Sequence, residues 1–182
     1  RELLTNKSAT GACWPGLTQE PAVYQASIGN PPVEFGESFV VTGQQPALFT
    51  GPLYTVYKIA TAIRLAKEIS KRHGICCTPV FWQGSDDHDF EEARSATVLT
   101  KNHEPLTLTY EPMHDVAGLP MYRVPLDNSA HDLVDRAADA TPGSEFRDEV
   151  RAFLHGSLSA ASSLADWSAR ISRPIRRRWR TA

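Results

Sequence analysis

Two short apolar segments on either side of one long amphipathic segment constrain the fold of this chain more than any other feature. Residues 39–41 and 79–82 are short runs rich in valine and aromatic residues, as buried β-strands are. Between them, apolar residues recur three or four positions apart and predict a helix with one apolar face: Leu53, Val56, Tyr57, Ile59, Ala60, Ile63, Ala66 and Ile69. Pro52 suits the start of that helix and Gly74 its end. The sequence therefore predicts an α/β fold that opens with a right-handed βαβ unit over residues 37–95.

Residues 96–140 predict a β-rich insertion after this unit. Apolar residues alternate with threonines from residue 106 to residue 110, as they do in a half-buried strand. The segment 121–126 is expected to pair with that strand as a hairpin. Asn128 is expected to cap a helix that runs to about residue 138.

Residues 141–171 predict helices. Thr141 and Pro142 open the first, whose expected apolar face comprises Phe146, Val150, Phe153 and Leu154. The second begins near residue 162 and has an apolar stripe of Leu164, Trp167 and Ile171. Residues 1–36, in contrast, form a leader rich in glycine, proline, serine and threonine, with little periodicity.

The formal net charge of −2 conceals a basic end on an acidic body. Six arginines and no acidic residue follow position 169, whereas residues 1–169 carry 13 basic and 21 acidic side chains. Trp179, which lies among these arginines, could stack on a nucleic-acid base. The acidic body has the wrong sign for a phosphate-binding surface, so no nucleic-acid partner is expected. Residues 172–182 are expected to be a basic tail that is disordered or translated out of frame.

Cysteine content and hydropathy indicate the class of environment. The chain has three cysteines, at positions 13, 76 and 77, and no C-x-x-C pair. This excludes a complete intrachain disulfide framework and a four-thiolate zinc site, and it fits a reducing cytoplasm. No run approaches 18 apolar residues, so no membrane partner is expected.

The first candidate site segment follows the first strand. The carboxyl ends of parallel strands meet at one edge of a sheet, and open α/β folds bind ligands there. Glycines at this turn allow close backbone approach, glutamines supply amide donors and acceptors, and the start of the helix favours an anion. An ordinary turn before a buried helix is the alternative. The candidate substrate- or nucleotide-binding residues are Thr42, Gly43, Gln44, Gln45, Gly51, Tyr54 and Lys58.

The second candidate segment follows the second strand and contains five carboxylates and one imidazole between Asp86 and Glu92. In a metal-binding interpretation, His88 and two of the aspartates hold a divalent ion. In an acid/base interpretation, Asp89 or Glu91 orients His88, which then moves a proton. A solvated acidic turn that caps the next helix is the third possibility. Its position after a strand, opposite the glutamine turn, favours a functional role.

Both segments, in this order, closely resemble the bacillithiol biosynthesis cysteine-adding enzyme family. The resemblance lies in residues 41–55, which read VTGQQPALFTGPLYT, and in the PVFW and DDHDFEE runs within residues 79–92. It continues more weakly at residues 121–126 and 162–166. It implies a partial Rossmann-like core of the class I nucleotidyl-transferring ligase type, interrupted by connecting insertions. Residues 51–54 then stand where class I synthetases carry a His-x-Gly-His signature.

The resemblance also implies a reaction. Members of the family add L-cysteine to glucosaminyl-malate, forming an amide bond in the last step of the synthesis of bacillithiol, a low-molecular-weight thiol. It implies small-molecule substrates, ATP or another nucleotide as a co-substrate, no metal, and homodimers formed through a coiled coil that this chain lacks. Family members are much longer, so the chain is expected to be an N-terminal fragment.

The residue roles implied by the resemblance centre on the acidic turn. His88, Asp89 and Glu91 are the candidate catalytic residues, with His88 taking the proton of the attacking amine, and Asp86 and Asp87 bind a cationic amino group. Asp86 stands where the family has glutamate, and residues 94–95 read Arg-Ser where Asn-His is frequent. The alternatives are a non-catalytic remnant and a metal-dependent hydrolase that uses the Asp-Asp-His-Asp turn.

Overall fold

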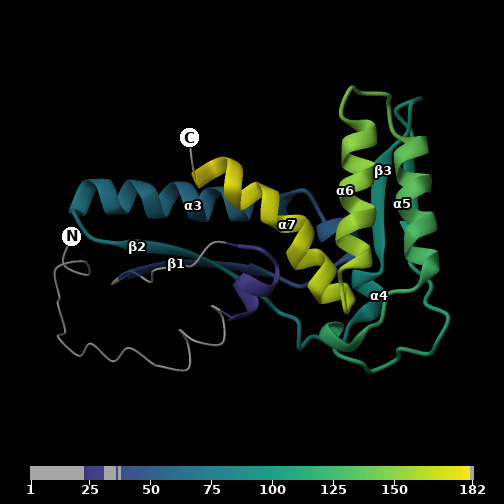
Figure 1. The fold of residues 1–182 in the computed structure, drawn as a ribbon, viewed down its shortest axis with the longest axis horizontal. Helices are drawn as coiled ribbons and strands as arrows, with labels where there is room; N and C mark the ends of the chain where they lie inside the picture. The colour runs from purple at the N-terminus through teal and green to yellow at the C-terminus, as the bar shows by residue number, and fades with distance from the viewer. Residues whose placement is uncertain (1–22, 31–35, 37, 181–182) are drawn as a thin grey trace. The chain divides into compact units, whose positions relative to one another are not determined.

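The computed structural model describes residues 23–30, 36 and 38–180, with side chains described as far as residue 174. The chain divides into two units, Arg1–Phe35 and Gly36–Ala182. In the first unit, residues 23–27 are helical, and the rest of the expected leader falls almost wholly outside the described residues. All the elements that position the candidate site belong to the second unit (Figure 1).

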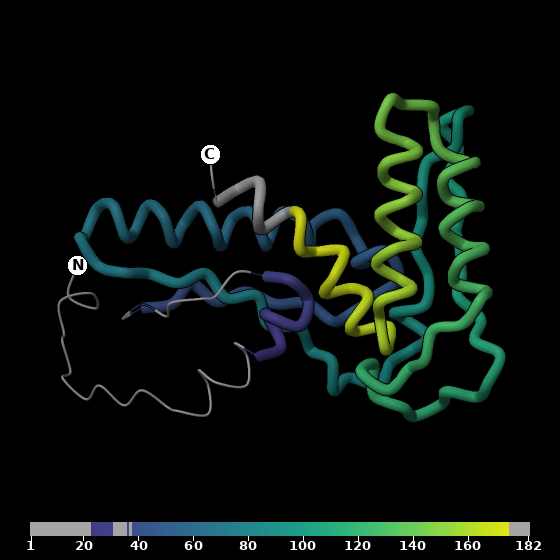
Figure 2. Tube along the Cα trace, viewed as in Figure 1, coloured from purple at the N-terminus to yellow at the C-terminus, as the bar shows by residue number. Residues whose placement is uncertain are grey.

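The second unit begins with the strand–helix–strand order that the periodicity predicts. Its elements are β1 (Ser38–Gln44), a 3₁₀ turn η1 (Leu48–Thr50), α3 (Tyr54–His73) and β2 (Cys77–Gln83). β1 and β2 pair in parallel, from Ser38 opposite Cys77 to Gln44 opposite Gln83, and α3 runs along the pair (Figure 2). Gly74 ends α3 in the left-handed conformation at φ 66°, as expected for its position.

The buried side of α3 is rotated slightly from the expected apolar face. Its buried residues are Thr55, Ile59, Ala62, Ile63 and Ala66, whereas Leu53 and Tyr57 are exposed. α3 packs against β1 and β2 and also against α7, so two sets of neighbours decide which residues become buried. Small alanines at 62 and 66 suit the close approach of these elements.

The strand expected at residues 106–110 exists, but the hairpin expected with residues 121–126 does not, because the partner strand precedes it in the chain. β3 (Ser95–Leu99) pairs antiparallel with β4 (Pro105–Thr109), and threonine hydroxyls at 97 and 107 meet across the strands at 3.1 Å. The segment 121–126, expected to be the partner, instead contains a 3₁₀ turn, η2 (Met121–Arg123). Pro120 and Pro125 flank this turn, and a proline cannot donate a hydrogen bond to a β-ladder.

Four helices complete the unit: α4 (Phe90–Ala93), α5 (Asn128–Ala140), α6 (Arg147–Ser159) and α7 (Leu164–Arg180). The cap of α5 is Asp127, one residue before the expected Asn128, and its carboxylate accepts from the backbone N–H of Ser129 at 2.9 Å. The backbone N–H of Met113 donates to the same carboxylate at 2.8 Å. Burial acts to raise the pKa of Asp127, but these hydrogen bonds outweigh it and hold the pKa below its ordinary value.

α6 and α7 differ from expectation in two ways. Phe146, Val150 and Phe153 are exposed, so that of the expected apolar face Leu154 alone packs against the core, together with Leu158. The backbone of residues 172–180, expected to be a disordered tail, continues α7 to Arg180. Arginine is a strong helix former and favours this extension, whereas Pro174 lies inside the helix, where a proline removes a backbone donor and its ring crowds the preceding turn.

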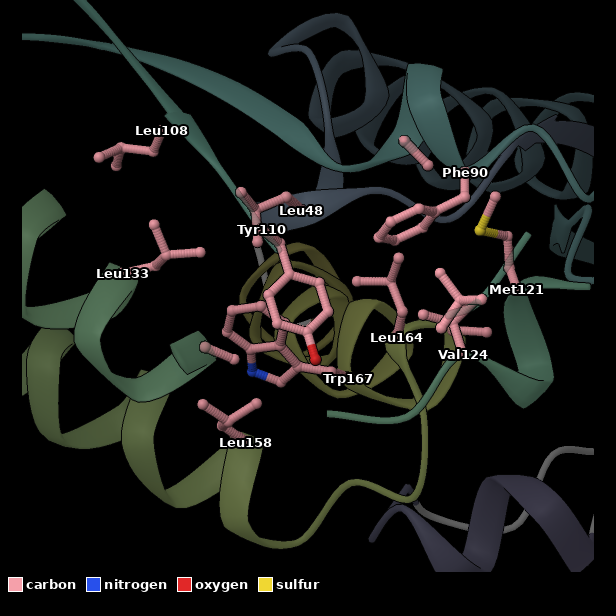
Figure 3. Packing of buried hydrophobic residues seen from close by; sticks show 14 of the residues in the cluster. Leu48, Phe90, Leu108, Tyr110, Met121, Val124, Leu133, Leu158, Leu164 and Trp167 are labelled. Atoms are coloured by element: carbon pink, nitrogen blue, oxygen red, sulfur yellow. The ribbon is translucent and has the colours of Figure 1, made fainter. Parts of the chain in front are cut away.

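The hydrophobic core of the unit surrounds Trp167 of α7, which is completely buried (Figure 3). Its indole Nε1 donates to the Ser157 hydroxyl at 3.0 Å, and Phe49 meets its ring edge-on with centroids 5.5 Å apart. Tyr110 donates to the Pro125 carbonyl at 2.9 Å, and burial, with the nearby Asp127 carboxylate, raises the pKa of Tyr110 to about 12. The apolar side chains that pack in this core include Leu48, Phe90, Leu108, Met121, Val124, Leu133, Val134, Leu158 and Leu164.

Candidate functional site

The two candidate segments meet at the carboxyl edge of the β1–β2 pair, as the parallel arrangement predicts. Gln44 lies opposite Gln83 in the register, and the N–H of Gly84 donates to the Gln44 carbonyl at 3.2 Å. A Cβ atom on Gly43 would lie 2.5 Å from the carbonyl oxygen of Trp82, closer than side-chain carbons approach. Glycine at position 43 therefore lets the two strand ends come together.

Lys58 organises the first turn from one helical turn inside α3. Its ammonium donates to the Gly43 carbonyl at 3.2 Å and to the Gln44 Oε1 at 2.9 Å, and lies 4.9 Å from the centre of the Tyr54 ring. Because Oε1 of Gln44 accepts from Lys58, the Nε2 amide group of Gln44 points away from Lys58 as a hydrogen-bond donor. The structure thus brings together four of the predicted binding residues, Gly43, Gln44, Tyr54 and Lys58, and orients the amide group of Gln44.

The chain reaches the start of α3 through three consecutive residues of positive φ. Phe49, Thr50 and Gly51 have φ values of 52°, 73° and 75°. Glycine adopts this region freely, whereas the β-branched Thr50 costs about 1–3 kcal/mol there and must be held by its surroundings. The preceding Leu48 is fully buried and Phe49 packs on Trp167, so the core fixes this conformation and with it the position of the helix start.

The acidic turn is exposed and is ordered by its own backbone. Asp87 Oδ1 accepts from the N–H of Asp89 at 2.9 Å, and Asp89 Oδ1 accepts from the N–H of Glu92 at 3.1 Å, which caps α4. Gln45 Nε2 donates to the Asp89 carbonyl at 3.2 Å and joins the acidic turn to the glutamine turn. Asp86, Asp87, His88 and Asp89 all remain accessible to solvent.

The two carboxylates that were expected to orient His88 make other contacts in the structure. Asp89 Oδ1 caps α4, and the Glu91 carboxylate pairs with Arg94 at 2.9 Å. No hydrogen bond joins His88 to either carboxylate among the described side chains. Each carboxylate is thus engaged by a contact within its own segment: Asp89 caps a helix and Glu91 forms an i,i+3 ion pair.

Three residues that sequence reasoning missed hold this edge of the sheet in place. The N–H groups of Met121 and Tyr122 donate to the carbonyls of Asp87 and Ser85 at 2.8 and 3.0 Å. The side chain of Gln83 donates to the Ala165 carbonyl at the start of α7, at 2.9 Å. Two of these contacts use backbone N–H donors, so the side-chain types of Met121 and Tyr122 could not predict them. Gln83 could not be distinguished from any other polar residue at the end of a strand.

The metal-binding interpretation of the acidic turn finds no matching geometry. In the part of the chain that the structure describes, no group of three or more His, Cys, Asp or Glu side chains is placed to hold a metal ion. The hydrolase alternative depended on such a group within the Asp-Asp-His-Asp turn. Within the same residues, no helix is both long enough and apolar enough to cross a membrane.

Comparison with known proteins adds family information. Residues 35–175 match the family model described as Bacillithiol biosynthesis BshC, N-terminal Rossmann-like domain. A protein of Salinibacter ruber named "Putative cysteine ligase BshC" is 41% identical over 136 residues, which are 75% of this chain and 25% of that protein. A protein of Natranaerobius thermophilus with the same name is 37% identical over 156 residues, 85% of this chain and 28% of that protein. The chain therefore spans about a quarter of the length of the curated relatives it matches.

Proposed function

This chain belongs to the bacillithiol biosynthesis BshC family, whose N-terminal Rossmann-like domain it matches, and from that premise we propose that it supplies part of the active site of a ligase. The proposed ligase joins the carboxyl group of L-cysteine to the amino group of glucosaminyl-malate through an amide bond, as the last step of bacillithiol synthesis. The names of the relatives support the ligase class and the cysteine substrate. The juxtaposition of the glutamine turn and the acidic turn, joined by Gln45 and Asp89, is the observation that carries the proposal.

The glutamine turn binds the anionic parts of the substrates in this proposal. The start of α3 offers the positive end of a 20-residue helix dipole. Gln44, whose Oε1 is held by Lys58, presents its Nε2 as a donor to a carboxylate or a developing oxyanion. Lys58 adds a positive charge beside the same turn. Support for these roles is the shared location of all three groups at the carboxyl edge of the sheet.

The acidic turn handles the amine. Asp86 and Asp87 are exposed carboxylates that can bind a cationic amino group. His88 lies between them and Asp89 in sequence and can accept the proton that the amine loses during attack. Asp89 holds the turn by capping α4, so its role in the proposal is to position His88 through the backbone. Glu91 remains a candidate whose carboxylate is paired with Arg94.

Amide formation also requires an activated carboxyl group. The family resemblance points to ATP or another nucleotide as the activating co-substrate, bound at the same edge of the sheet. The amine then attacks the activated carboxyl carbon, and the amide bond forms as the bond to the nucleotide-derived activating group breaks. That group leaves with the bonding electrons, and His88 accepts the proton that the amine loses.

The proposal is tested in the full-length protein that carries this domain, by measuring amide formation from L-cysteine and glucosaminyl-malate. A His88→Ala change should lower the turnover about 100-fold or more, the usual contribution of a general base. Asp89→Asn, which keeps an acceptor for the α4 cap, should lower turnover less. His114→Ala is the matched control, since His114 is also an exposed histidine and has no role in the proposal. Wild-type turnover in His88→Ala would reject the assignment.

Calorimetric titration of this 182-residue chain with ATP, cysteine and glucosaminyl-malate separates the role of the domain from that of the whole enzyme. Binding by this chain, lost in Gln44→Ala, would locate the pocket at the two turns. Binding by a full-length relative alone would mean that the pocket needs further parts of the protein. A chain that binds nothing and melts without cooperativity would favour the remnant alternative.

A further inference from the structure

Two histidines form a direct contact between α5 and α6, far from the strand ends in sequence. The Nδ1 atoms of His131 and His155 are 2.8 Å apart, the ring planes are within 9° of parallel, and the ring centroids are 5.1 Å apart. The Nδ1 atoms are much closer than the centroids, so the rings meet edge to edge rather than face to face. This is the geometry of an Nδ1–H···Nδ1 hydrogen bond between two imidazoles.

A carboxylate fixes the outer end of this contact. The Nε2 atom of His155 lies 3.0 Å from Asp135 Oδ1, and Arg151 Nε lies 3.4 Å from the same oxygen. The hydrogen bond from His155, followed by the charges of His155 and Arg151, holds the pKa of Asp135 below its ordinary value, although burial acts in the opposite direction. Asp135 is therefore a carboxylate that only accepts, and the Nε2 atom of His155 must carry the donated proton.

The proton count of the pair follows from this arrangement. An Nδ1–Nδ1 hydrogen bond needs one N–H group and one lone pair, so only one proton fits between the two rings. If both Nδ1 atoms carried protons, two donors would face each other at 2.8 Å and the bond would be lost. This is the state of the pair when both rings are cationic, since a cationic imidazole has a proton on each nitrogen, and two such rings would also lie close to the guanidinium of Arg151.

We propose that His131 and His155 form a one-proton clasp that joins α5 to α6 when the two rings share a single Nδ1 proton, and that opens when acidification adds a second. The charged groups around the pair come from the two helices themselves. Asp135 and Asp139 lie on α5, and Arg151, which pairs with both, lies on α6. The other elements that pack against these helices, β4 and α7, contribute Leu108 and Trp167 there, and neither side chain gains or loses a charge in this range.

The clasp is coupled to the core. α5 and α6 lie side by side (Figure 1), and Leu133, Val134 and Leu158 of these helices are buried around Trp167. The closed clasp can carry at most one positive charge, because only one proton fits between the two Nδ1 atoms, whereas the same two imidazoles in an unfolded chain can carry two. The unfolded state then binds more protons at acidic pH, so the clasp contributes stability at neutral pH and loses that contribution as the pH falls.

Nitrogen NMR of the histidine-labelled chain tests the clasp directly. At about pH 8, within the range where imidazoles are neutral, one Nδ1 of the pair should be protonated and the other not, with a through-hydrogen-bond coupling between them. At about pH 5 the coupling should be absent. A pair without coupling at the higher pH, or with coupling that persists at the lower pH, would overturn the proposal.

Urea unfolding provides the second measurement. Between about pH 8 and about pH 5, the unfolding constant of the wild-type chain should rise about tenfold more than that of His131→Asn, which is the equivalent of one hydrogen bond. Asparagine keeps an amide near the Nδ1 position but does not titrate. His114→Asn, which removes an exposed histidine outside the pair, should follow the wild-type profile. Identical profiles for wild type and His131→Asn would contradict the clasp.

Discussion

The surroundings of Trp167 and the acidic turn after β2 are built in opposite ways. Around Trp167, side chains such as Leu48, Leu164 and Val134 are completely buried and hold one another by packing. In the acidic turn, the side chains of Asp86 and His88 are exposed, and the turn is ordered by hydrogen bonds of the backbone. The first region carries the stability of the unit and the second carries its candidate chemistry.

The difference shows how a turn full of charges can still have a defined shape. Mutual repulsion among its carboxylates disfavours any compact form of the turn. Its carbonyls, however, accept from the N–H groups of Met121 and Tyr122, and Met121 itself is completely buried in the core. Packing in one region therefore fixes the backbone of the other, while the side chains of Asp86 and His88 remain exposed to solvent.

The largest test of this comparison is the removal of the central side chain. Trp167→Ala should lower the free energy of unfolding by about 3–5 kcal/mol, the range for large aromatic truncations in a core. Trp82→Ala is the matched control, because Trp82 is 63% exposed, and it should cost less than about 1 kcal/mol. Urea unfolding followed by circular dichroism measures both. Equal losses for the two tryptophans would break the distinction between the regions.

A smaller effect is expected where the strand ends approach each other. Gly43→Ala places a Cβ 2.5 Å from the Trp82 carbonyl, so the strands must shift, at a cost of about 1–3 kcal/mol. Gly84→Ala, in the same turn region, meets nothing within 4 Å and should change stability by less than about 0.5 kcal/mol. Unfolding curves of the two variants decide this. If the Gly43→Ala chain were as stable as the Gly84→Ala chain, the strand ends would have room for a side chain between Gly43 and the Trp82 carbonyl.

The smallest predicted effect concerns the cap of α5, where the charged carboxylate of Asp127 stabilises the start of a helix that packs in the core. Asp127→Ala should cost about 1 kcal/mol at neutral pH, whereas Asp127→Asn should retain most of the capping energy. The pKa of Asp127 is lowered in the fold, so the carboxylate stabilises the fold above its unfolded pKa and loses this effect as the pH falls through the folded pKa. The difference between wild type and Asp127→Ala should therefore shrink on acidification, and a pH-independent difference would contradict it.

The sequence was sufficient for the elements whose signal is local. The apolar spacing from residue 53 to residue 69 locates α3, Gly74 locates its end, and the two strands follow from short apolar runs. The meeting of the glutamine and acidic turns follows from parallel pairing alone. What such patterns could not supply was the choice among partners: β4 pairs with β3 rather than with residues 121–126, because the prolines there remove donors.

Contacts between distant residues with ordinary side chains were also beyond sequence reasoning. His131 and His155 are single histidines on two different helices, and no residue pattern around either of them predicts their contact. The same holds for the backbone donors of Met121 and Tyr122. The roles of His88, Asp89 and Glu91 stay predictions, although the structure already assigns two of these carboxylates to local contacts.

The parallel pairing of β1 with β2 has a consequence for the order of folding. The β3–β4 hairpin and the α5–α6 pair each join segments that are near neighbours along the chain, so only short loops must close. β1 and β2 are separated by the whole of α3, and their alignment must await the closure of that longer connection. Because Gly84 bonds to Gln44 across these strands, the edge that carries the candidate chemistry is among the last parts of the unit to acquire its final geometry.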